Sequence, residues 1–261
     1  MDLNNKYIWE GTYKSFSECP GAGKGYEATS ASQRYVDQLK KFLLDNSSLE
    51  KDIILKRHRD NHLPVLVATL QAQLSRPIRI LDFGGGIGFT YAVLSQCLTD
   101  SANIDYTILD TEEVCKAGAD VFKNNKNLKF VKSISEINVN TNYDVIHFGS
   151  SIHYVEKWKE LISKLNGFSP KFFLFTDFLG GSFEDFVTTQ NYYESKIPVW
   201  FFNLNNFKSF FKDIGYNFSF QSTYHPTIFG KEQDMPMDNF PEDQRLKNSV
   251  NILFCKKPEN K

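Results

Sequence analysis

The stretch Arg79-Ile80-Leu81-Asp82-Phe83-Gly84-Gly85-Gly86-Ile87-Gly88-Phe89 indicates the fold most clearly. An apolar run, predicted as a strand, passes into a turn rich in glycine, and a helix is predicted to follow over 89–98. Glycines in such a turn permit positive φ angles and a close approach of the backbone to a ligand. In open α/β sheets, ligands bind at the carboxyl ends of the strands. The stretch therefore predicts a ligand site at the end of a buried strand.

The spacing of the glycines distinguishes between two classes of ligand. A dinucleotide fingerprint needs G-x-G-x-x-G, and counting from Gly84 places its third glycine on Phe89. The pattern that fits is Asp-x-Gly-x-Gly-x-Gly on Asp82, Gly84, Gly86 and Gly88. A carboxylate just before the turn is unfavourable beside a pyrophosphate and suits a positively charged group, such as an amine or a sulfonium. An NAD(P)-dependent oxidoreductase is thus the alternative, and the spacing argues against it.

A second acidic residue supports this interpretation. Asp110 ends the next predicted strand, 104–110, and follows Gly88 by 22 residues (110 − 88). An acid at the end of the second strand can accept hydrogen bonds from both ribose hydroxyls. The same residue could instead cap the helix predicted over 112–122. Given the turn upstream, we expect ribose binding.

From residue 77 onward, short β-rich runs alternate with helical ones. Further strands are predicted over 128–132, 143–148 and 171–177, and further helices over 155–165 and 204–214. Such alternation is typical of βαβ units in a mainly parallel sheet covered on both faces. The last two predicted strands, 216–223 and 249–256, have no helix between them and are expected to pair antiparallel at one edge. Two longer stretches, 178–203 and 224–248, are predicted as functional loops.

The first part of the chain lacks this alternation of predicted strands and helices. Residues 1–76 are predicted to form an N-terminal helical cap, which leaves 77–261 as the sheet domain. Two helices are expected in the cap, over 31–44 and 63–74, from the helical spacing of their apolar residues. The cap is expected to help close the site and exclude water.

Composition excludes several classes of protein. The chain has 261 residues, of which 41% are hydrophobic, so it is not disordered as a whole. Lys and Arg number 30 and Asp and Glu 31, and this balance argues against nucleic acid as a partner. No apolar run approaches the roughly 20 residues of a membrane span, and the N-terminus lacks a signal-peptide pattern. The four scattered cysteines predict reduced thiols in a cytoplasmic protein, and no cluster predicts a metal site. The 15% of aromatic residues fits either a heavy core or a pocket lined with rings.

Four stretches give the sequence a specific resemblance to a known family. They are Trp9-Glu10-Gly11-x-Tyr13-x-Ser15-Phe16, Leu81-Asp82-Phe83-Gly84-Gly85, Ser150-Ser151-Ile152-His153-Tyr154 and Pro198-Val199-Trp200-Phe201-Phe202. With Asp110 and the strand order, the chain resembles the class I S-adenosylmethionine-dependent methyltransferases. More narrowly, it resembles a bacterial family of methyltransferases associated with surface-polysaccharide pathways such as capsule and lipopolysaccharide synthesis.

The resemblance implies a fold and a cofactor site. The fold would be a Rossmann-like α/β sheet of seven mainly parallel strands with an antiparallel C-terminal hairpin. S-adenosylmethionine would bind over the turn, with Asp110 on its ribose. The implied cofactor residues are Asp82, Phe83, Gly84, Gly85, Gly86, Gly88 and Asp110, then Ser133 and Ile134 beside the adenine, and Gly149, Ser150 and Ser151 beside the reactive methyl.

Methyl transfer is an in-line displacement, so the enzyme mainly aligns the donor and the acceptor. A neutral hydroxyl acceptor also needs a base. An anionic acceptor, such as a phosphoryl or phosphoramidate oxygen, needs cationic or hydrogen-bonding groups instead. His153 is the leading candidate base, because it follows the fourth strand and imidazole titrates near neutral pH. Asp177, at the end of the fifth strand, could orient His153 or act as the base itself, whereas His147 is expected to be a core histidine.

The acceptor is expected to be a small polar metabolite or a nucleotide-activated sugar, and a phosphoryl or phosphoramidate oxygen is the specific variant to test first. The predicted contacts to it are Tyr13, Tyr26, Arg59, Tyr192, Tyr193 and His225. Arg59 lies in the polar run 56–62, which is either a solvated face or a site for an anionic acceptor. The resemblance thus implies O-methylation in surface-polysaccharide modification, with a non-catalytic cofactor-binding relative as a further alternative.

Overall fold

The computed structural model describes residues 7–21, 29–45, 61–98, 100–101, 103–192, 195–228 and 231–258. The chain divides into two compact units. We refer to residues 26–149 and 164–174 as the glycine-turn unit, and to residues 1–25, 150–163 and 175–261 as the hairpin unit. The expected cap over 1–76 and sheet domain over 77–261 stay a prediction beside this division.

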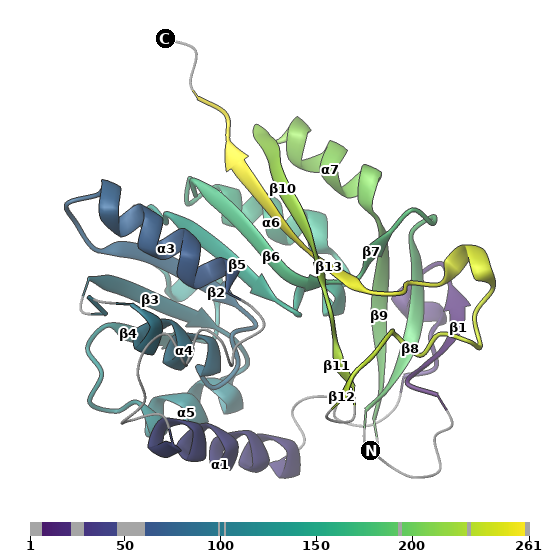
Figure 1. The fold of residues 1–261 in the computed structure, drawn as a ribbon, viewed down its shortest axis with the longest axis horizontal. Helices are drawn as coiled ribbons and strands as arrows, with labels where there is room; N and C mark the ends of the chain where they lie inside the picture. Colours follow the sequence, from purple (N-terminus) through teal and green to yellow (C-terminus); the bar gives the residue numbers. More distant parts are fainter. Residues whose placement is uncertain are drawn as a thin grey trace. The chain divides into compact units, whose positions relative to one another are not determined.

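A seven-stranded sheet has the strand order β10-β13-β6-β5-β2-β3-β4 (Figure 1). Its strands are β2 (Ile78–Phe83), β3 (Ile104–Leu109), β4 (Leu128–Val131), β5 (Val145–Gly149), β6 (Phe172–Phe178), β10 (Tyr216–Tyr224) and β13 (Ser249–Lys256). β2 pairs in parallel with β3 and β5, and β3 pairs in parallel with β4. β10 and β13 pair antiparallel, with β10 at the edge. The predicted α/β class, parallel core and antiparallel C-terminal pair are therefore confirmed.

The glycine-turn unit places a helix against the turn itself. Its helices are α1 (Thr29–Asp45), α3 (His62–Gln73), α4 (Phe89–Cys97) and α5 (Glu112–Val121), with a short 3-10 turn η3 (Ile134–Glu136). α1 packs on α5, and α3 packs on α4 and β2 (Figure 1). Leu39 of α1 is fully buried in one hydrophobic cluster with Ile87 of the turn and Ala92 of α4. The rings of Phe42 and Phe89 lie 4.8 Å apart by their centroids. One helix of the predicted cap thus stabilises the glycine turn.

The hairpin unit contains a second sheet that the sequence did not predict. Its order is β1-β8-β9-β7, with β1 (Trp9–Tyr13), β7 (Gly180–Gly181), β8 (Phe186–Tyr192) and β9 (Ser195–Asn203). β8 and β9 form an antiparallel hairpin, and β1 pairs antiparallel with β8 (Figure 1). The prediction of a loop over 178–203 is therefore wrong. β8 and β9 are both rich in β-branched and aromatic residues, which favour strands. The prediction missed them because it looked for strands that alternate with helices, whereas a turn connects the two strands of a hairpin.

Rings fill the core of the hairpin unit. Phe186 and Phe201 stack across the hairpin with 5.0 Å between centroids, and the ring of Trp9 meets that of Phe201 at 5.9 Å. A second group lies around Phe207, whose ring is 4.4 Å from that of Phe178. Most of the largest fully buried side chains of the described residues are phenylalanines. The aromatic excess is thus mainly a core, the first of the two meanings that composition left open.

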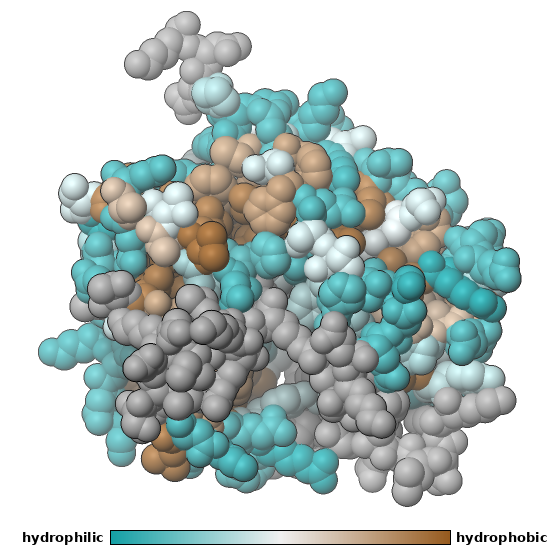
Figure 2. Space-filling view, viewed as in Figure 1, coloured by the Kyte–Doolittle hydropathy of each residue, from teal (hydrophilic) through white to brown (hydrophobic). Residues whose placement is uncertain are grey.

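The remaining elements of the described residues complete the fold. They are η1 (Phe16–Glu18), η4 (Ile152–Tyr154), α6 (Trp158–Asn166), α7 (Leu204–Asp213), β11 (Thr227–Ile228), β12 (Lys231–Glu232) and η5 (Glu242–Gln244). Figure 2 shows hydrophilic residues over much of the described surface on this face, with apolar residues in smaller groups between them. Among the described residues, no helix combines the length and the apolar character needed to cross a membrane.

Candidate functional site

The glycine turn connects the end of β2 to the start of α4. Gly84, Gly86 and Gly88 have φ angles of 67°, 60° and 97°, in the left-handed region that side chains with a Cβ rarely adopt. The Gly84 N–H donates to the Leu109 carbonyl at 2.8 Å, which ties the turn to the end of β3. A Cβ atom on Gly86 would meet nothing within 4 Å. The backbone at Gly86 therefore borders open space, as a ligand site requires.

Asp82 lies beneath the turn rather than on its open side. Its Oδ2 accepts a hydrogen bond from the Tyr106 hydroxyl at 2.7 Å, and its Oδ1 lies 2.8 Å from His147 Nδ1. A Cβ atom on Gly85 would lie 2.5 Å from Asp82 Oδ2, so a larger residue there would force the turn or the carboxylate to shift. The buried Asp82 carboxylate therefore supports the turn from below, and its contact with a positively charged cofactor stays a prediction. His147 is a satisfied core histidine, as predicted.

Asp110 joins the glycine turn to the next βα connection. Its Oδ2 accepts from the Gly86 N–H at 2.9 Å, and its Oδ1 accepts from the Thr111 N–H at 2.7 Å. Burial raises the pKa of Asp110 above its ordinary value, and these two hydrogen bonds oppose that rise. Because each carboxylate oxygen has two lone pairs, both oxygens retain capacity to accept further hydrogen bonds. The ribose contact of Asp110 remains a prediction, and the geometry leaves it possible.

The other predicted cofactor residues of the glycine-turn unit follow the neighbouring strands. Phe83 ends β2, and its ring lies 5.3 Å from that of Phe148 in β5. Ser133 precedes η3, where its Oγ accepts from the Ser135 N–H at 3.2 Å, and Ile134 is half-buried. Gly149 ends β5. Parallel neighbours in one sheet have their carboxyl ends at the same edge, so these residues lie at the edge where the glycine turn lies. Their contacts with the cofactor stay predictions.

His153 belongs to the hairpin unit, three residues after the exposed Ser150, and it follows the buried Ser151 and Ile152. The φ angle of Ser150 is 53°, and its N–H donates to the Thr176 carbonyl at 2.9 Å. The His153 side chain is buried, and its Nδ1 has no hydrogen-bond partner among the described residues. Desolvation lowers the pKa of His153 to about 3. A group with so low a pKa is a weak general base at neutral pH, but its unprotonated Nδ1 can accept a hydrogen bond.

Asp177 is held by the C-terminal strand β13. Its φ angle is 52°, its Oδ1 accepts from the Ser249 hydroxyl at 2.5 Å, and its N–H donates to Asn251 Oδ1 at 3.1 Å. No hydrogen bond joins Asp177 to His153 in the described part of the chain. The idea that Asp177 orients His153 therefore gains no support. Its carboxylate is half-buried, and its role as the alternative base stays a prediction.

The predicted acceptor contacts lie at separate places. Tyr13 is half-buried on β1, where its ring folds over the β-bulge at Gly11. Tyr192 is half-buried at the end of β8, and His225 is exposed just after β10. The remaining three, Tyr26, Arg59 and Tyr193, lie outside the described residues. No group of three or more metal-ligating side chains occurs among the described residues.

Sequence reasoning missed the polar side chains of β8. Gln190 Oε1 accepts from the Tyr154 hydroxyl at 2.8 Å, which links β8 to η4. Asn191 is fully buried, and its Oδ1 has no hydrogen-bond partner in the described structure. The buried Trp9 Nε1 on the neighbouring strand β1 is likewise unsatisfied there. The signal was the polar run 188–191 inside an otherwise apolar segment, which the loop prediction had absorbed.

Comparison with known proteins gives the class of enzyme. The family described as "Methyltransferase domain" matches residues 55–218, which is more than half of the chain. This chain belongs to the methyltransferase-domain family. It is an S-adenosylmethionine-dependent methyltransferase, and the oxidoreductase and non-catalytic alternatives are set aside. No curated protein matches the methyltransferase.

Solved structures agree on the fold of the methyltransferase. A SAM-dependent methyltransferase from Methanosarcina mazei aligns with a TM-score of 0.52 at 12% identity, over 73% of this chain and 98% of that one. The 1,6-didemethyltoxoflavin-N1-methyltransferase of Burkholderia thailandensis aligns with a TM-score of 0.50 at 13% identity, over 91% of this chain and 94% of that one. The second structure holds 1,6-didemethyltoxoflavin and S-adenosylhomocysteine. At such identities the likeness shows the fold alone.

The glycine-turn unit of the methyltransferase fits this cofactor. The open space beside Gly86 admits a ligand close to the backbone, and Asp110 retains acceptor capacity for ribose hydroxyls. When bound, S-adenosylmethionine supplies a methyl group on a positively charged sulfur. The residues of this chain would hold it through the turn 84–88 and Asp110, with Asp82 supporting the turn from below.

Proposed function

We propose that this methyltransferase methylates a neutral hydroxyl oxygen of a small polar acceptor, such as a nucleotide-activated sugar. The observation that carries this is the chemistry of the buried polar side chains in the hairpin unit. They are Ser151, His153, Thr176, Thr188, Thr189, Asn191, Ser195, Ser249 and Asn251. All are uncharged at neutral pH, since the pKa of His153 is about 3. A phosphoryl or phosphoramidate oxygen would need cationic partners, so a hydroxyl is the better match.

Unsatisfied buried groups support a polar acceptor. His153 Nδ1 and Asn191 Oδ1 can accept hydrogen bonds, and Trp9 Nε1 can donate one. A buried polar group without a partner costs about 1–3 kcal/mol. A molecule that brings both hydroxyl donors and oxygen acceptors would relieve these costs. We therefore assign His153 to holding the acceptor rather than to taking its proton.

A hydroxyl acceptor needs a base, and Asp177 is the residue we propose for it. Its half-buried carboxylate accepts from the Ser249 hydroxyl, and its backbone N–H donates to Asn251 Oδ1; Ser249 and Asn251 are both fully buried on β13. Fixing a base in this way lowers the cost of aligning it with the acceptor proton.

The pathway follows from the resemblance alone. Three of the four stretches that carry it lie in the hairpin unit, around β1, η4 and β9. Enzymes that share a fold differ in acceptor through the residues of their individual sites, and such residues can lie on elements added outside the shared sheet. We accordingly propose a role in surface-polysaccharide modification, with Tyr13 and Tyr192 as further acceptor contacts.

The test is transfer of a labelled methyl group from S-adenosylmethionine to a panel of acceptors. The panel contains nucleotide sugars, phosphoramidates and primary amines at equal concentration. We expect label on nucleotide-sugar hydroxyls, and about a hundredfold lower kcat for Asp177→Asn with little change in cofactor affinity. Asp185→Asn serves as the matched control, because it removes an exposed carboxylate of the same unit, just before β8. Transfer only to phosphoramidate oxygen or to amine nitrogen would contradict the proposal.

A further inference from the structure

A cavity lies at the end of the parallel strands opposite to the glycine turn. It has a volume of about 330 Å³ and is lined by Arg76, Pro77, Arg79, Ile104, Asp105, Lys126, Asn127 and Lys129. These residues precede or begin β2, β3 and β4, whereas the glycine turn follows the far end of β2. A strand the length of β2 spans about 16 Å, so the cavity is separate from the cofactor site.

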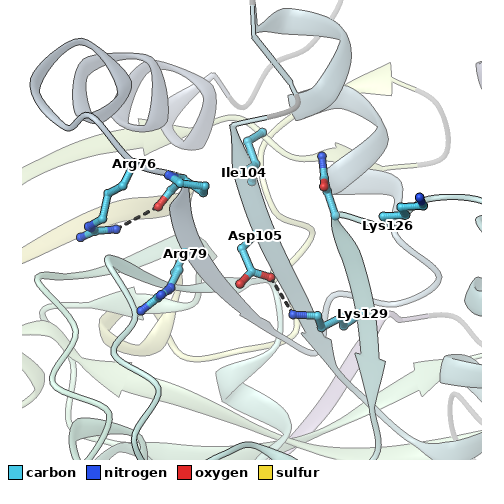
Figure 3. A pocket seen from close by; sticks show the side chains of 8 residues that line it. Arg76, Arg79, Ile104, Asp105, Lys126 and Lys129 are labelled. Carbon is cyan, nitrogen blue, oxygen red and sulfur yellow. Dashed lines mark hydrogen bonds and ion pairs between the residues drawn. The ribbon is translucent and has the colours of Figure 1, made fainter.

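The charge of this lining is strongly positive. Four of the lining side chains are cationic and one, Asp105, is anionic. Figure 3 shows Arg76 and Arg79 on one side of the cavity and Lys126 on the other, with Asp105 pointing toward Lys129 between them. A concave site with an excess of positive charge concentrates anions.

One of the arginines is fixed by a buried carboxylate. Asp144 accepts from both terminal nitrogens of Arg76 at 2.7 Å and from the backbone N–H of Arg79 at 3.1 Å. The Arg76 guanidinium also donates to the Pro77 carbonyl at 2.9 Å. Of its five N–H donors, the guanidinium thus retains some that are unused, held in a fixed orientation.

The other cations are available to a ligand. Arg79 and Lys126 are exposed, and neither side chain forms a hydrogen bond or ion pair with any described residue. Lys129 pairs with Asp105 at 3.1 Å, but both side chains are substantially exposed, so this pair is weak and can exchange partners. Available cations on both sides of a cavity are what a bound anion requires.

The spacing of the strands sets the size of the anion. β3 lies between β2 and β4, so residues on β2 and β4 are separated by about 10 Å, twice the distance between neighbouring strands. A single phosphate is too short to meet cations on both sides. Two or three linked phosphates can do so. We propose that this cavity binds a small molecule that carries a diphosphate or triphosphate group, as a second site independent of methyl transfer.

A small molecule fits better than a nucleic acid. The cations surround a cavity instead of following a long surface stripe, and the chain as a whole has a net charge of -1. Nucleic-acid binding rests on an extended basic surface that neutralises many phosphates.

The experiment is calorimetric titration of the full chain with phosphate, pyrophosphate and tripolyphosphate at low ionic strength. We expect one site per chain, with affinity rising from phosphate to tripolyphosphate. Arg79→Gln and Lys126→Gln should each weaken tripolyphosphate binding by about fivefold, which is typical of one charge contact near a surface. Lys123→Gln removes the same charge from the same connection but outside the lining, and should leave the affinity unchanged.

Three results would overturn the proposal. They are the absence of saturable binding by all three anions, equal weakening by Lys123→Gln, and binding of a single-stranded RNA oligomer without binding of tripolyphosphate. Circular dichroism of each variant shows whether its fold is intact. Affinity for S-adenosylmethionine, measured in parallel, should be unchanged in all three variants because the cavity lies at the opposite end of β2.

Discussion

Asp82 Oδ1 and His147 Nδ1 lie 2.8 Å apart, and both side chains are only 1% exposed. With the Tyr106 hydroxyl on the other carboxylate oxygen, they form a buried polar group directly under the glycine turn. The shape of the cofactor turn therefore depends on a residue of β5 that is 65 positions away in the chain.

Removing His147 should destabilise the protein strongly. His147→Ala leaves a buried carboxylate with one hydrogen-bond partner fewer, and a buried acceptor left unsatisfied costs about 1–3 kcal/mol. His147→Gln keeps an N–H donor and should cost less. Urea unfolding gives the free energy of unfolding for each variant. Asp105→Asn at the exposed pair with Lys129 is the control and should cost less than about 1 kcal/mol. Equal losses at the two sites would show that the buried pair has no special role.

Gly85→Ala should weaken cofactor binding. The new Cβ atom would lie 2.5 Å from Asp82 Oδ2, so either the turn or the carboxylate must move. Forced contacts of this kind cost about 1–3 kcal/mol, which corresponds to roughly tenfold in affinity if the turn moves. Calorimetry with S-adenosylmethionine measures the effect. Gly21→Ala, where the added Cβ atom meets nothing within 4 Å, should bind normally. Normal binding by Gly85→Ala would mean that the turn does not carry the cofactor.

Asp110→Ala should reduce affinity for S-adenosylmethionine by about tenfold or more, because it removes both the anchor of Gly86 and the proposed ribose acceptor. Asp110→Asn retains one acceptor oxygen and should lose less. Asp120→Asn, an exposed change on the same βα connection, is the control. Unchanged affinity in Asp110→Ala would refute the ribose assignment.

The same carboxylate predicts a pH dependence. Because burial raises the pKa of Asp110, it becomes protonated at a higher pH than an ordinary aspartate with a pKa of 3.8. As the pH is lowered, cofactor affinity should therefore begin to fall at a higher pH than it would with an ordinary aspartate. The effect on folding has the opposite sign: the ionised form is disfavoured in the folded state, and this cost is relieved as the pH falls. Titrations across acidic pH should show the inflection in the natural chain and not in Asp110→Ala.

We expect His153 to make the free energy of unfolding depend on pH. It should add no inflection to the pH profile of kcat. Its folded pKa of about 3 lies below the ordinary value of 6.5, so the unfolded chain takes up a proton that the folded chain does not. Stability is then lost as the pH falls below about 6.5, by on the order of 2 kcal/mol at two pH units lower. Urea unfolding at several pH values should show that His153→Gln removes this loss, while exposed His225→Gln does not. A kcat profile with an inflection near neutral pH that disappears in His153→Gln would restore His153 as the base.

Local sequence patterns predicted the cofactor side of the molecule well. The spacing of Gly84, Gly86 and Gly88 specified the turn, because positive φ angles are a property of single residues and of their neighbours. Asp110 followed from the parallel arrangement of strands, which aligns their carboxyl ends. The same patterns failed for β8 and β9, since a buried hairpin with polar residues on both faces has neither helical nor simple alternating periodicity.

By itself, the sequence determined the class of fold, the parallel core with its antiparallel end, and the position of the cofactor turn. Only the tertiary structure decided which side chains the polar residues meet: Asp82 with His147, Asp177 with Ser249, and Thr188 with the Glu10 carbonyl, 178 positions away. The physical reason is that turns and strands depend on residues close in the chain. The partner of a buried polar group depends instead on strand order, which brings distant residues together and leaves each such group to find a hydrogen bond there.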